Sequence, residues 1–399
     1  MVERKTAVDA VVKELVVYLD NAATSFPKPE KVYEAVLHAM REVGASPGRG
    51  GYRRSLEAAR ILFQAREAVA GFFSITDSSR IIFTANATGA LNLALQGTLA
   101  VGDHVITTSM EHNSLLRPLY ALRNTGVELS IVTAGSDGVV SVEDIRRAVR
   151  VNTRMIAVSH VSNVCGAIQP IKQLAELSRE VGALFLVDAA QSAGCLPIDV
   201  EHFAIDLLAV PGHKGLLGPG GTGLLYVAPH VQLKPVIHGG TGGHSTVEEQ
   251  PLIMPDGFEA GTHNLPGIAG LQAGIEFICE LGLAAVYKHE QALLKRSEQA
   301  LRDIPGVTVY GPIDPSARCS VLSFAASGVD PGLLAAELDH GFDIAVRAGL
   351  HCAPLAHRTL GTLPGGTVRL SPGWFTTSED IAFFSDAVVQ CIDKIRKSA

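Results

Sequence analysis

The sequence lacks most of the features that mark specialised classes of protein. Its 399 residues carry a net charge of −7, so there is no excess of positive charge to attract nucleic acid or an anionic membrane. No apolar run approaches the length of a membrane-spanning helix, and the N-terminal residues lack the apolar core of a signal peptide. These absences predict a cytoplasmic protein whose main partner is neither a nucleic acid nor a membrane.

Cysteine is scarce and scattered. The six cysteines include no Cys-x-x-Cys pair, which disfavours a disulfide framework or a zinc site, and we predict no metal site. Five of them are expected to pack as small apolar side chains, whereas Cys352 lies in a distinctive segment described below. There is also no internal repeat or low-complexity segment. With 47% hydrophobic and 18% charged residues, the composition is that of an ordinary globular protein.

The order of apolar segments indicates the fold class. From Arg80 to Asp188, runs of strand composition alternate with helical segments of ten or more residues. This alternation is typical of βαβ units and predicts an α/β fold with a doubly wound, mostly parallel sheet. After residue 264 a long helical stretch is followed by short strands and two further helices. We therefore predict an extension at 1–16, a large domain at 17–264 and a smaller α+β domain at 265–399.

The segment DLLAVPGHKGLLGPGGTGLLYV, from Asp206 to Val227, has two strand-like runs around a glycine-rich loop. The loop carries one amine, that of Lys214, directly after His213. A lysine held between buried strands loses hydration, which lowers its pKa and suits it to Schiff-base chemistry. The alternative is a glycine-rich hairpin whose lysine points to water.

A second motif, ALFLVDAAQS, precedes that loop and ends a predicted strand at Asp188, with Gln191 just beyond. Ligands bind at the carboxyl ends of strands in open α/β sheets, although an acid at this place can also cap a helix. Pyridoxal 5'-phosphate needs a carboxylate to keep its pyridine nitrogen protonated. With its Asp188, Gln191 and Lys214 in this order, the sequence resembles the fold-type I pyridoxal-phosphate enzymes. Within them it resembles the class V cysteine desulfurases and selenocysteine lyases.

This resemblance implies roles at the phosphate end of the cofactor. In FTANATGALNLAL, Thr88 and the backbone of Gly89 stand at a predicted helix start, where N–H groups and the helix dipole favour a phosphate. An ordinary threonine N-cap is the alternative. The resemblance adds His213 as a phosphate contact and Thr262 as a residue that reaches the partner subunit's phosphate, which implies a homodimer. Pro211 stands where the family commonly has serine, so one phosphate hydroxyl is missing.

Other residues match positions around the cofactor ring. The resemblance implies that His112 stacks on the pyridine ring and relays protons, although a polar histidine at a strand end is the simpler interpretation. It also implies that Gln191 and Asn163 contact the phenolic oxygen of the cofactor, with Asn163 also near the substrate. Arg49, in an early glycine-rich loop, is a further substrate or cross-subunit candidate unless it is simply an exposed arginine.

The C-terminal part supplies candidates for the substrate. Arg369 in TVRLSPG matches the arginine that clamps a substrate carboxylate, a role that suits a planar guanidinium, and Arg347 is a second candidate. Cys352, in AVRAGLHCAP, matches the catalytic cysteine of the family, on a loop that could swing toward a sulfur acceptor. Its short spacing to Arg369 resembles the SUF-type group. The alternative is a cysteine that packs in the core.

Together these features predict a cysteine desulfurase. It would convert L-cysteine to L-alanine, hold a persulfide on Cys352 and pass the sulfur to an acceptor protein or small thiol, in a pathway such as iron–sulfur cluster assembly. Selenocysteine lyase, cysteine sulfinate desulfinase, transaminase and epimerase are alternatives within the same class. A catalytically silent scaffold is disfavoured because Lys214, Asp188 and Cys352 are all present.

Overall fold

The computed structural model describes residues 17–48, 50–243, 246–319 and 321–398. Its largest sheet has seven strands in the order β2-β8-β7-β6-β5-β3-β4. Neighbouring strands are parallel except where β8 pairs with β2 and β7. The predicted α/β fold with a mostly parallel, doubly wound sheet is confirmed. The strand bounds are β2 Ile81–Thr84, β3 His104–Thr108, β4 Glu128–Val132, β5 Thr153–Ser159, β6 Leu184–Asp188, β7 Leu207–Pro211 and β8 Gly223–Val227.

The helices before and between these strands agree with the predicted alternation of helices and strands. They are α2 Glu30–His38 with a π-helical turn at Ala39–Val43, α3 Arg53–Phe72, α4 Ala87–Thr98, α5 Asn113–Arg123, α6 Val142–Ala148 and α7 Ile171–Val181. The side chain of Ser141 accepts the Asp144 N–H, so Ser141 is the N-cap of α6. All residues of β6, β7 and β8 are buried, as expected for central strands.

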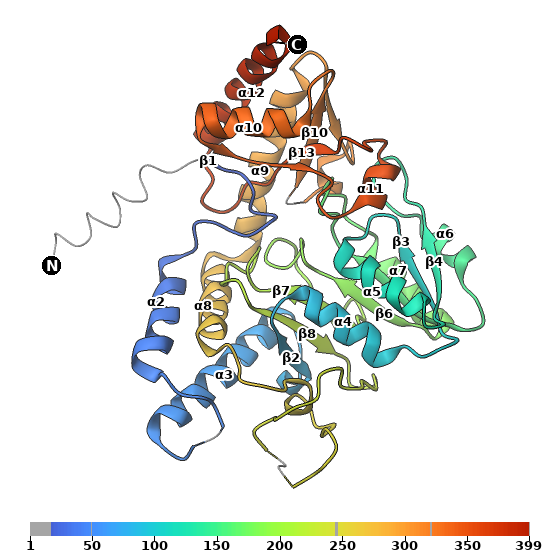
Figure 1. Ribbon diagram of the computed structural model, residues 1–399, viewed down its shortest axis with the longest axis vertical. Helices are drawn as coiled ribbons and strands as arrows, with labels where there is room; N and C mark the ends of the chain where they lie inside the picture. The colour runs from blue at the N-terminus through green and yellow to red at the C-terminus, as the bar shows by residue number, and fades with distance from the viewer. Residues whose placement is uncertain (1–16, 49, 244–245, 320, 399) are drawn as a thin grey trace, which may run out of the picture.

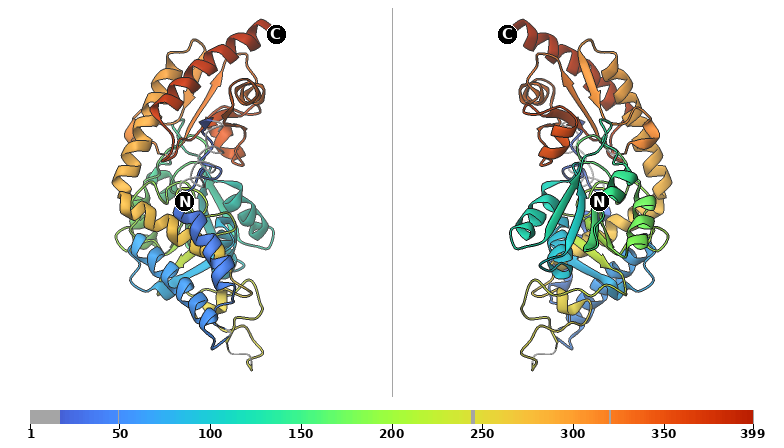
Figure 2. Two further views of the ribbon diagram at one scale, coloured as in Figure 1. Left: turned by 90° about the vertical axis from the view of Figure 1, so that its left-hand side faces the viewer. Right: turned by 90° about the vertical axis from the view of Figure 1, so that its right-hand side faces the viewer.

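A second, four-stranded sheet lies at one end of the molecule (Figure 1). Its order is β12-β13-β10-β9, and it has its own hydrophobic core around Leu322, Phe324, Val368 and Phe384. The long helix α9 runs along one side of the molecule (Figure 2) and packs against elements of this small sheet. The elements of this C-terminal part are α8 Leu265–Leu281, α9 Leu283–Arg302, β9 Val307–Tyr310, β10 Leu322–Ala326, α10 Pro331–Phe342, β11 Ile344–Ala345, β12 Arg347–Gly349, α11 Pro354–Thr359, β13 Thr367–Leu370 and α12 Ser378–Ser398.

Two contacts join segments that are far apart in the sequence. Strand β1 Val17–Tyr18 pairs with β11, and Leu19 packs in the core beside the small sheet. Helix α8 packs against α2 and α3. The start of the described chain therefore lies beside the C-terminal elements, which brings Asp20 to the space between the two sheets.

One prediction about cysteine is wrong. Cys165, Cys195, Cys319 and Cys391 are buried, but Cys279 is exposed on α8. Helix α8 turns Ile275 and Ile278 into the core, and the next position along a helix lies about 100° away from that face.

Among the described residues, no single helix is both long and apolar enough to span a membrane. Helices α8 and α9 meet that test only when taken together, and they are bent by 84° at their junction.

Candidate active site

The carboxyl ends of β3, β5, β6 and β7 surround a cavity of about 230 Å³, which also receives residues from β12 and β13. This is the edge of the sheet at which open α/β folds bind ligands. Most of the predicted site residues line this one cavity. They are Thr88, His112, Asn163, Asp188, Gln191, His213, Lys214, Arg347 and Arg369.

Lys214 lies on the loop between β7 and β8, and its accessible surface lines the cavity. Burial lowers the pKa of its amine to about 8; Asp188 opposes this shift, and Arg369 and Arg347 reinforce it. This excludes the alternative interpretation, a glycine-rich hairpin whose lysine points to water. A large share of the amine is neutral near pH 8, as a proton acceptor or nucleophile requires.

Glycine holds this loop close to the neighbouring chain. A Cβ atom added at Gly215 would lie 2.3 Å from the Ala193 carbonyl oxygen, and one added at Gly194 would lie 2.1 Å from the Gly215 carbonyl oxygen. Gly194 also has a φ of 88°, which disfavours any residue with a side chain. The close approach sets Lys214 beside the segment that follows Asp188.

Asp188 ends β6 and is almost fully buried. Burial raises the pKa of its carboxyl, while a 2.9 Å hydrogen bond from the Ala190 N–H and the charge of Lys214 oppose the shift. A buried carboxylate at a cavity wall is stabilised by a cationic N–H donor. The protonated pyridine nitrogen of pyridoxal phosphate has that chemistry.

Sequence reasoning missed a second buried acid, Glu111. Its carboxylate accepts hydrogen bonds from the Thr108 hydroxyl at 2.6 Å and from the N–H and hydroxyl of Ser159 at 2.8 and 2.6 Å. Burial raises its pKa to about 7; these hydrogen bonds oppose the shift, and Asp188 adds to it. Glu111 thus ties the end of β3 to the end of β5. Its position just after a strand, directly before His112, was the available signal.

His112 is the N-cap of α5. Its Nδ1 accepts the Ser114 N–H at 3.0 Å and lies 2.8 Å from the Ser114 hydroxyl oxygen. Burial, together with Lys214, Arg347 and other cations, lowers the pKa of the imidazole to about 4. The ring is therefore neutral, with its proton on Nε2. This uncharged ring offers a flat face against which a ligand can stack.

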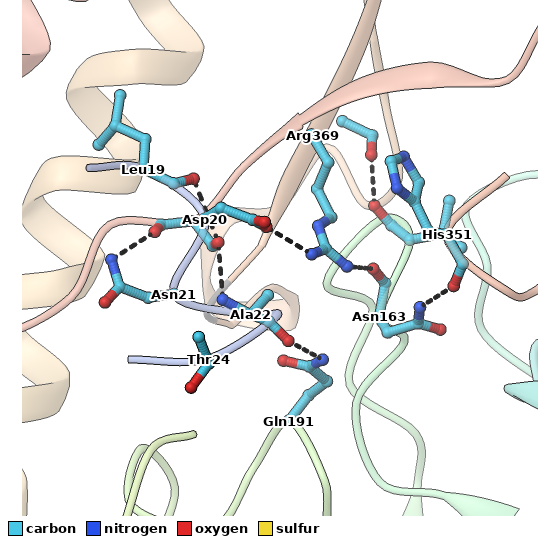
Figure 3. Close-up of polar contacts among 12 residues, drawn as sticks. Leu19, Asp20, Asn21, Ala22, Thr24, Asn163, Gln191, His351 and Arg369 are labelled. Carbon is cyan, nitrogen blue, oxygen red and sulfur yellow. Dashed lines mark hydrogen bonds and ion pairs between the residues drawn. The ribbon is translucent and has the colours of Figure 1, made fainter. Parts of the chain in front are cut away.

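Arg369 also lines the cavity and makes several of the polar contacts drawn in Figure 3. Its guanidinium donates to Asp20 Oδ1 at 2.8 Å and to the Asn163 carbonyl oxygen at 3.1 Å. Its buried Nε has no hydrogen-bond partner within the described part of the chain. Asp20 was missed in the sequence, although it directly follows the strand-like run at the start of DNAATS.

Arg347 lies directly opposite Arg369 on the neighbouring strand. Like charges in facing positions repel each other. Among the residues that the structure describes, no acidic side chain forms an ion pair with Arg347. An anionic ligand between the two guanidinium groups would relieve the repulsion, so this wall favours a carboxylate.

The loop between β12 and α11 carries Cys352. Cys352 is exposed and does not itself line the cavity, whereas the residue directly before it, His351, does. The loop is tied to the large sheet on both sides of this position. The Asn163 side-chain amide donates to the His351 carbonyl oxygen at 2.7 Å, and the Asn113 N–H donates to the Cys352 carbonyl oxygen at 2.8 Å. The expected swing of the loop would break both bonds, and the core alternative for Cys352 is excluded.

The residues predicted to bind the phosphate do not all line the same cavity. Asn86, not Thr88, is the N-cap of α4, and its side chain accepts the Gly89 N–H at 2.9 Å. Thr88 lines the cavity with Lys214, while Gly89 and Thr262 line a neighbouring cavity of about 400 Å³. Arg49 lies outside the described residues.

The remaining polar contacts at the cavity position the amide of Gln191. Its Nε2 donates to the Ala22 carbonyl oxygen at 3.1 Å (Figure 3). The amide of Asn163 is likewise used by the cysteine loop. Both side chains line the cavity, but in this structure each has a hydrogen bond that fixes its orientation.

Comparison with known proteins decides the family. The family model for Aminotransferase class-V matches residues 17–384, which is most of the chain. The chain belongs to the class-V aminotransferase family. It is 39% identical to a probable cysteine desulfurase of Methanothermobacter thermautotrophicus, over 93% of this chain and 94% of that protein.

Solved structures of this family agree with that relationship. The apo structure of a cysteine desulfurase from Thermococcus onnurineus superposes with a TM-score of 0.88 at 34% identity, covering 95% of each chain. The cysteine desulfurase CsdA of Escherichia coli gives a TM-score of 0.85 at 28% identity, covering 96% of each chain. The class-V chain thus shares the whole fold-type I architecture of these enzymes.

Proposed function

We propose that the protein is a pyridoxal-phosphate-dependent cysteine desulfurase that converts L-cysteine to L-alanine and holds the sulfur on Cys352. The observation that carries this proposal is the shared cavity. It brings Lys214 and Asp188 together with Arg369 and His351, and the exposed Cys352 follows directly after His351. The cysteine desulfurases to which the chain is similar support the same activity.

The residues of the cavity fit the cofactor. Asp188 would pair with the pyridine nitrogen, the neutral His112 ring would lie against the cofactor ring, and Thr88 would hold the phosphate at the start of α4. When bound there, pyridoxal phosphate supplies an electron sink for negative charge at the substrate α-carbon. Lys214 would anchor its aldehyde carbon.

The substrate would be held by its carboxylate. Arg369, already oriented by Asp20, and Arg347 offer two guanidinium groups to one anion. Lys214, with its pKa near 8, would take the proton from the α-carbon and return it to carbon. The limited access of water to this amine keeps the proton available for that return.

The sulfur step would use the thiol of Cys352 as a thiolate. Its Sγ attacks the substrate sulfur, the S–S bond forms and the C–S bond breaks. The electron pair of the C–S bond stays with the substrate β-carbon, which takes up a proton and becomes the methyl group of alanine. The products are alanine and a Cys352 persulfide, so no external oxidant or reductant is needed. The exposed position of Cys352 lets an acceptor thiol collect the sulfur.

Selenocysteine lyase and cysteine sulfinate desulfinase are the second candidates, because the same carboxylate wall and Lys214 would serve all three substrates. An exposed thiol next to a cavity residue has no use in a transaminase or an epimerase. The short, tied loop of Cys352 favours the SUF-type group.

The test is Cys352→Ala, with Cys279→Ala as a matched control that removes the other exposed cysteine. Cys352→Ala should keep the cofactor absorbance and bind L-cysteine, form no persulfide and lose at least about 100-fold in alanine production, on the scale of losing one catalytic group. Cys279→Ala should match the wild type. Parallel assays with L-selenocysteine and L-cysteine sulfinate rank the substrates. Wild-type alanine production by Cys352→Ala would mean that the thiol is not the sulfur carrier.

We also propose a homodimer with shared sites. The outer faces of α2, of the π-helical turn that follows it and of α3 expose large apolar side chains, as interaction surfaces do: Tyr33, Leu37, Met40, Leu56 and Phe63. Thr262 does not line the Lys214 cavity of its own chain, which fits a contact with the phosphate in the partner.

A further inference from the structure

The phosphate end of the cavity has few obvious anion-binding side chains. Pro211, the last residue of β7, lines this cavity but has neither a hydroxyl nor an N–H to donate. Burial, with Lys214 and Lys28, lowers the pKa of the nearby His213 to about 4, so its ring is neutral. Hydroxyl donors therefore matter more here than in a site with a charged side chain.

Ser114 brings a hydroxyl to this place. It lines the cavity, and its Oγ lies 2.8 Å from the hydroxyl oxygen of Thr88. Its Oγ also lies 2.8 Å from Nδ1 of His112. The single lone pair of Nδ1 already accepts the Ser114 backbone N–H, so the hydroxyl hydrogen can turn to another acceptor.

The backbone strengthens the case for an anion between these two hydroxyls. Thr88 is in the first turn of the 12-residue α4, and Ser114 is in the first turn of the 11-residue α5. The two helices pack against each other and their first turns meet at the contact between Thr88 and Ser114, so both positive helix ends lie at this end of the cavity. The Ala87 and Thr88 N–H groups precede the first intrahelical hydrogen bond of α4 and add two donors.

We propose that Ser114 is a phosphate-binding residue, whose hydroxyl acts with that of Thr88 and replaces the donor that position 211 lacks. This inference rests on the proposed function, because the anion is the phosphate group of pyridoxal phosphate. The hydroxyl leaves the vicinity of His112 Nδ1 and donates to a phosphate oxygen. The backbone N–H of Ser114 keeps the imidazole in place.

The experiment compares two ligands that differ only in the phosphate. Apo-protein is titrated with pyridoxal phosphate and with pyridoxal, following the absorbance. Ser114→Ala should weaken the binding of pyridoxal phosphate at least about tenfold, the scale of one hydrogen bond to a charged group, and leave pyridoxal binding unchanged. Ser114→Thr keeps a hydroxyl and should bind pyridoxal phosphate like the wild type. The matched control is Ser141→Ala, which removes a hydroxyl at the start of α6, outside the cavity.

Two further measurements complete the test. The ³¹P resonance of the bound cofactor should shift in Ser114→Ala and not in Ser141→Ala. The double variant Ser114→Ala/Pro211→Ser should recover affinity for pyridoxal phosphate. If it does not, the Ser114 hydroxyl does not replace the donor that position 211 lacks. Equal weakening of both ligands, or unchanged binding of pyridoxal phosphate, would overturn the role of Ser114. Failure of the wild type to bind pyridoxal phosphate at Lys214 would instead contradict the proposed function.

Discussion

Two lysines near the cavity have amines that burial makes less basic. The pKa of Lys28, like that of Lys214, is lowered to about 8 by burial. Lys28 Nζ is engaged by the carbonyl oxygen of Ser25, the hydroxyl of Ser25 and the carbonyl oxygen of His213. Three acceptors hold that amine as an ammonium, whereas Lys214 lines the cavity. Lowered basicity alone thus does not identify the reactive residue.

We therefore expect borohydride to fix pyridoxal phosphate covalently to Lys214. Lys28→Met should keep the label and Lys214→Ala should lose it, as measured by peptide mass spectrometry. Because only the neutral amine reacts, the rate of cofactor attachment should rise from pH 7 to pH 9, through the lowered pKa of Lys214. A label on Lys28 would contradict the assignment.

Glu111 gives a prediction of pH-dependent stability. Burial raises its pKa to about 7 in the folded protein, so it favours folding while it stays protonated, and this contribution is lost as the pH rises from about 4.5 through 7. Glu111→Gln cannot ionise. Relative to the wild type, the variant should gain about 3 kcal/mol of unfolding free energy between pH 4 and pH 8. Urea unfolding of both apo-proteins at the two pH values measures this, and a constant difference would contradict it.

At the scale of elements, a buried ion pair joins α3 to the segment that leads into α8. The guanidinium of Arg66 donates to both carboxylate oxygens of Glu259 at 2.8 and 2.9 Å, and His263 and the Phe83 N–H share the same carboxylate. Burial alone would raise the pKa of Glu259, but hydrogen bonds from His263 and Arg66 outweigh it and lower the pKa. This clamp lies next to Thr262.

Glu259→Gln should cost about 3–5 kcal/mol of unfolding free energy at pH 7, because Arg66 keeps a buried charge without its partner. Denaturant unfolding measures the loss. The double variant Arg66→Met/Glu259→Leu removes both charges and should recover most of it. In the wild type, the stability that the ionised Glu259 contributes is present above the ordinary pKa of glutamate. It is lost as the pH falls through the lowered pKa of Glu259 in the folded protein. A double variant as unstable as the single one would show that packing, not charge, dominates here.

At the scale of the whole molecule, the position of Thr262 predicts shared active sites. If the protein is a homodimer with shared sites, a Lys214→Ala chain and a Thr262→Ala chain should each form defective homodimers. Random exchange should place one intact site in each mixed dimer, so about a quarter of the wild-type sites should return. Alanine production after mixing measures this. Proven exchange without recovery, together with weaker cofactor binding by Thr262→Ala in its own cavity, would contradict the shared site.

Local patterns determined much of this protein. Alternating strand and helix segments predicted the large sheet, because the periodicity of apolar residues and the apolar runs of central strands are visible within short segments of sequence. Strand-end residues such as Asp188 and Lys214 could be predicted to meet, since parallel strands present their carboxyl ends at one edge. The domain boundary at 264/265 and the roles of the site residues stay predictions.

Only the tertiary structure decided the contacts between distant segments. Asp20 reaches Arg369 because β1 pairs with β11, a pairing of two residues in each strand that no periodicity reveals. The hydroxyl of Ser114 contacts that of Thr88 because α4 and α5 start at the same edge of the sheet. The local sequence around either residue does not predict this contact. The Cys352 loop is fixed by Asn113 and Asn163, which lie about two hundred residues away. Sequence patterns fix which residues share an element, whereas the packing of elements fixes which side chains share a cavity.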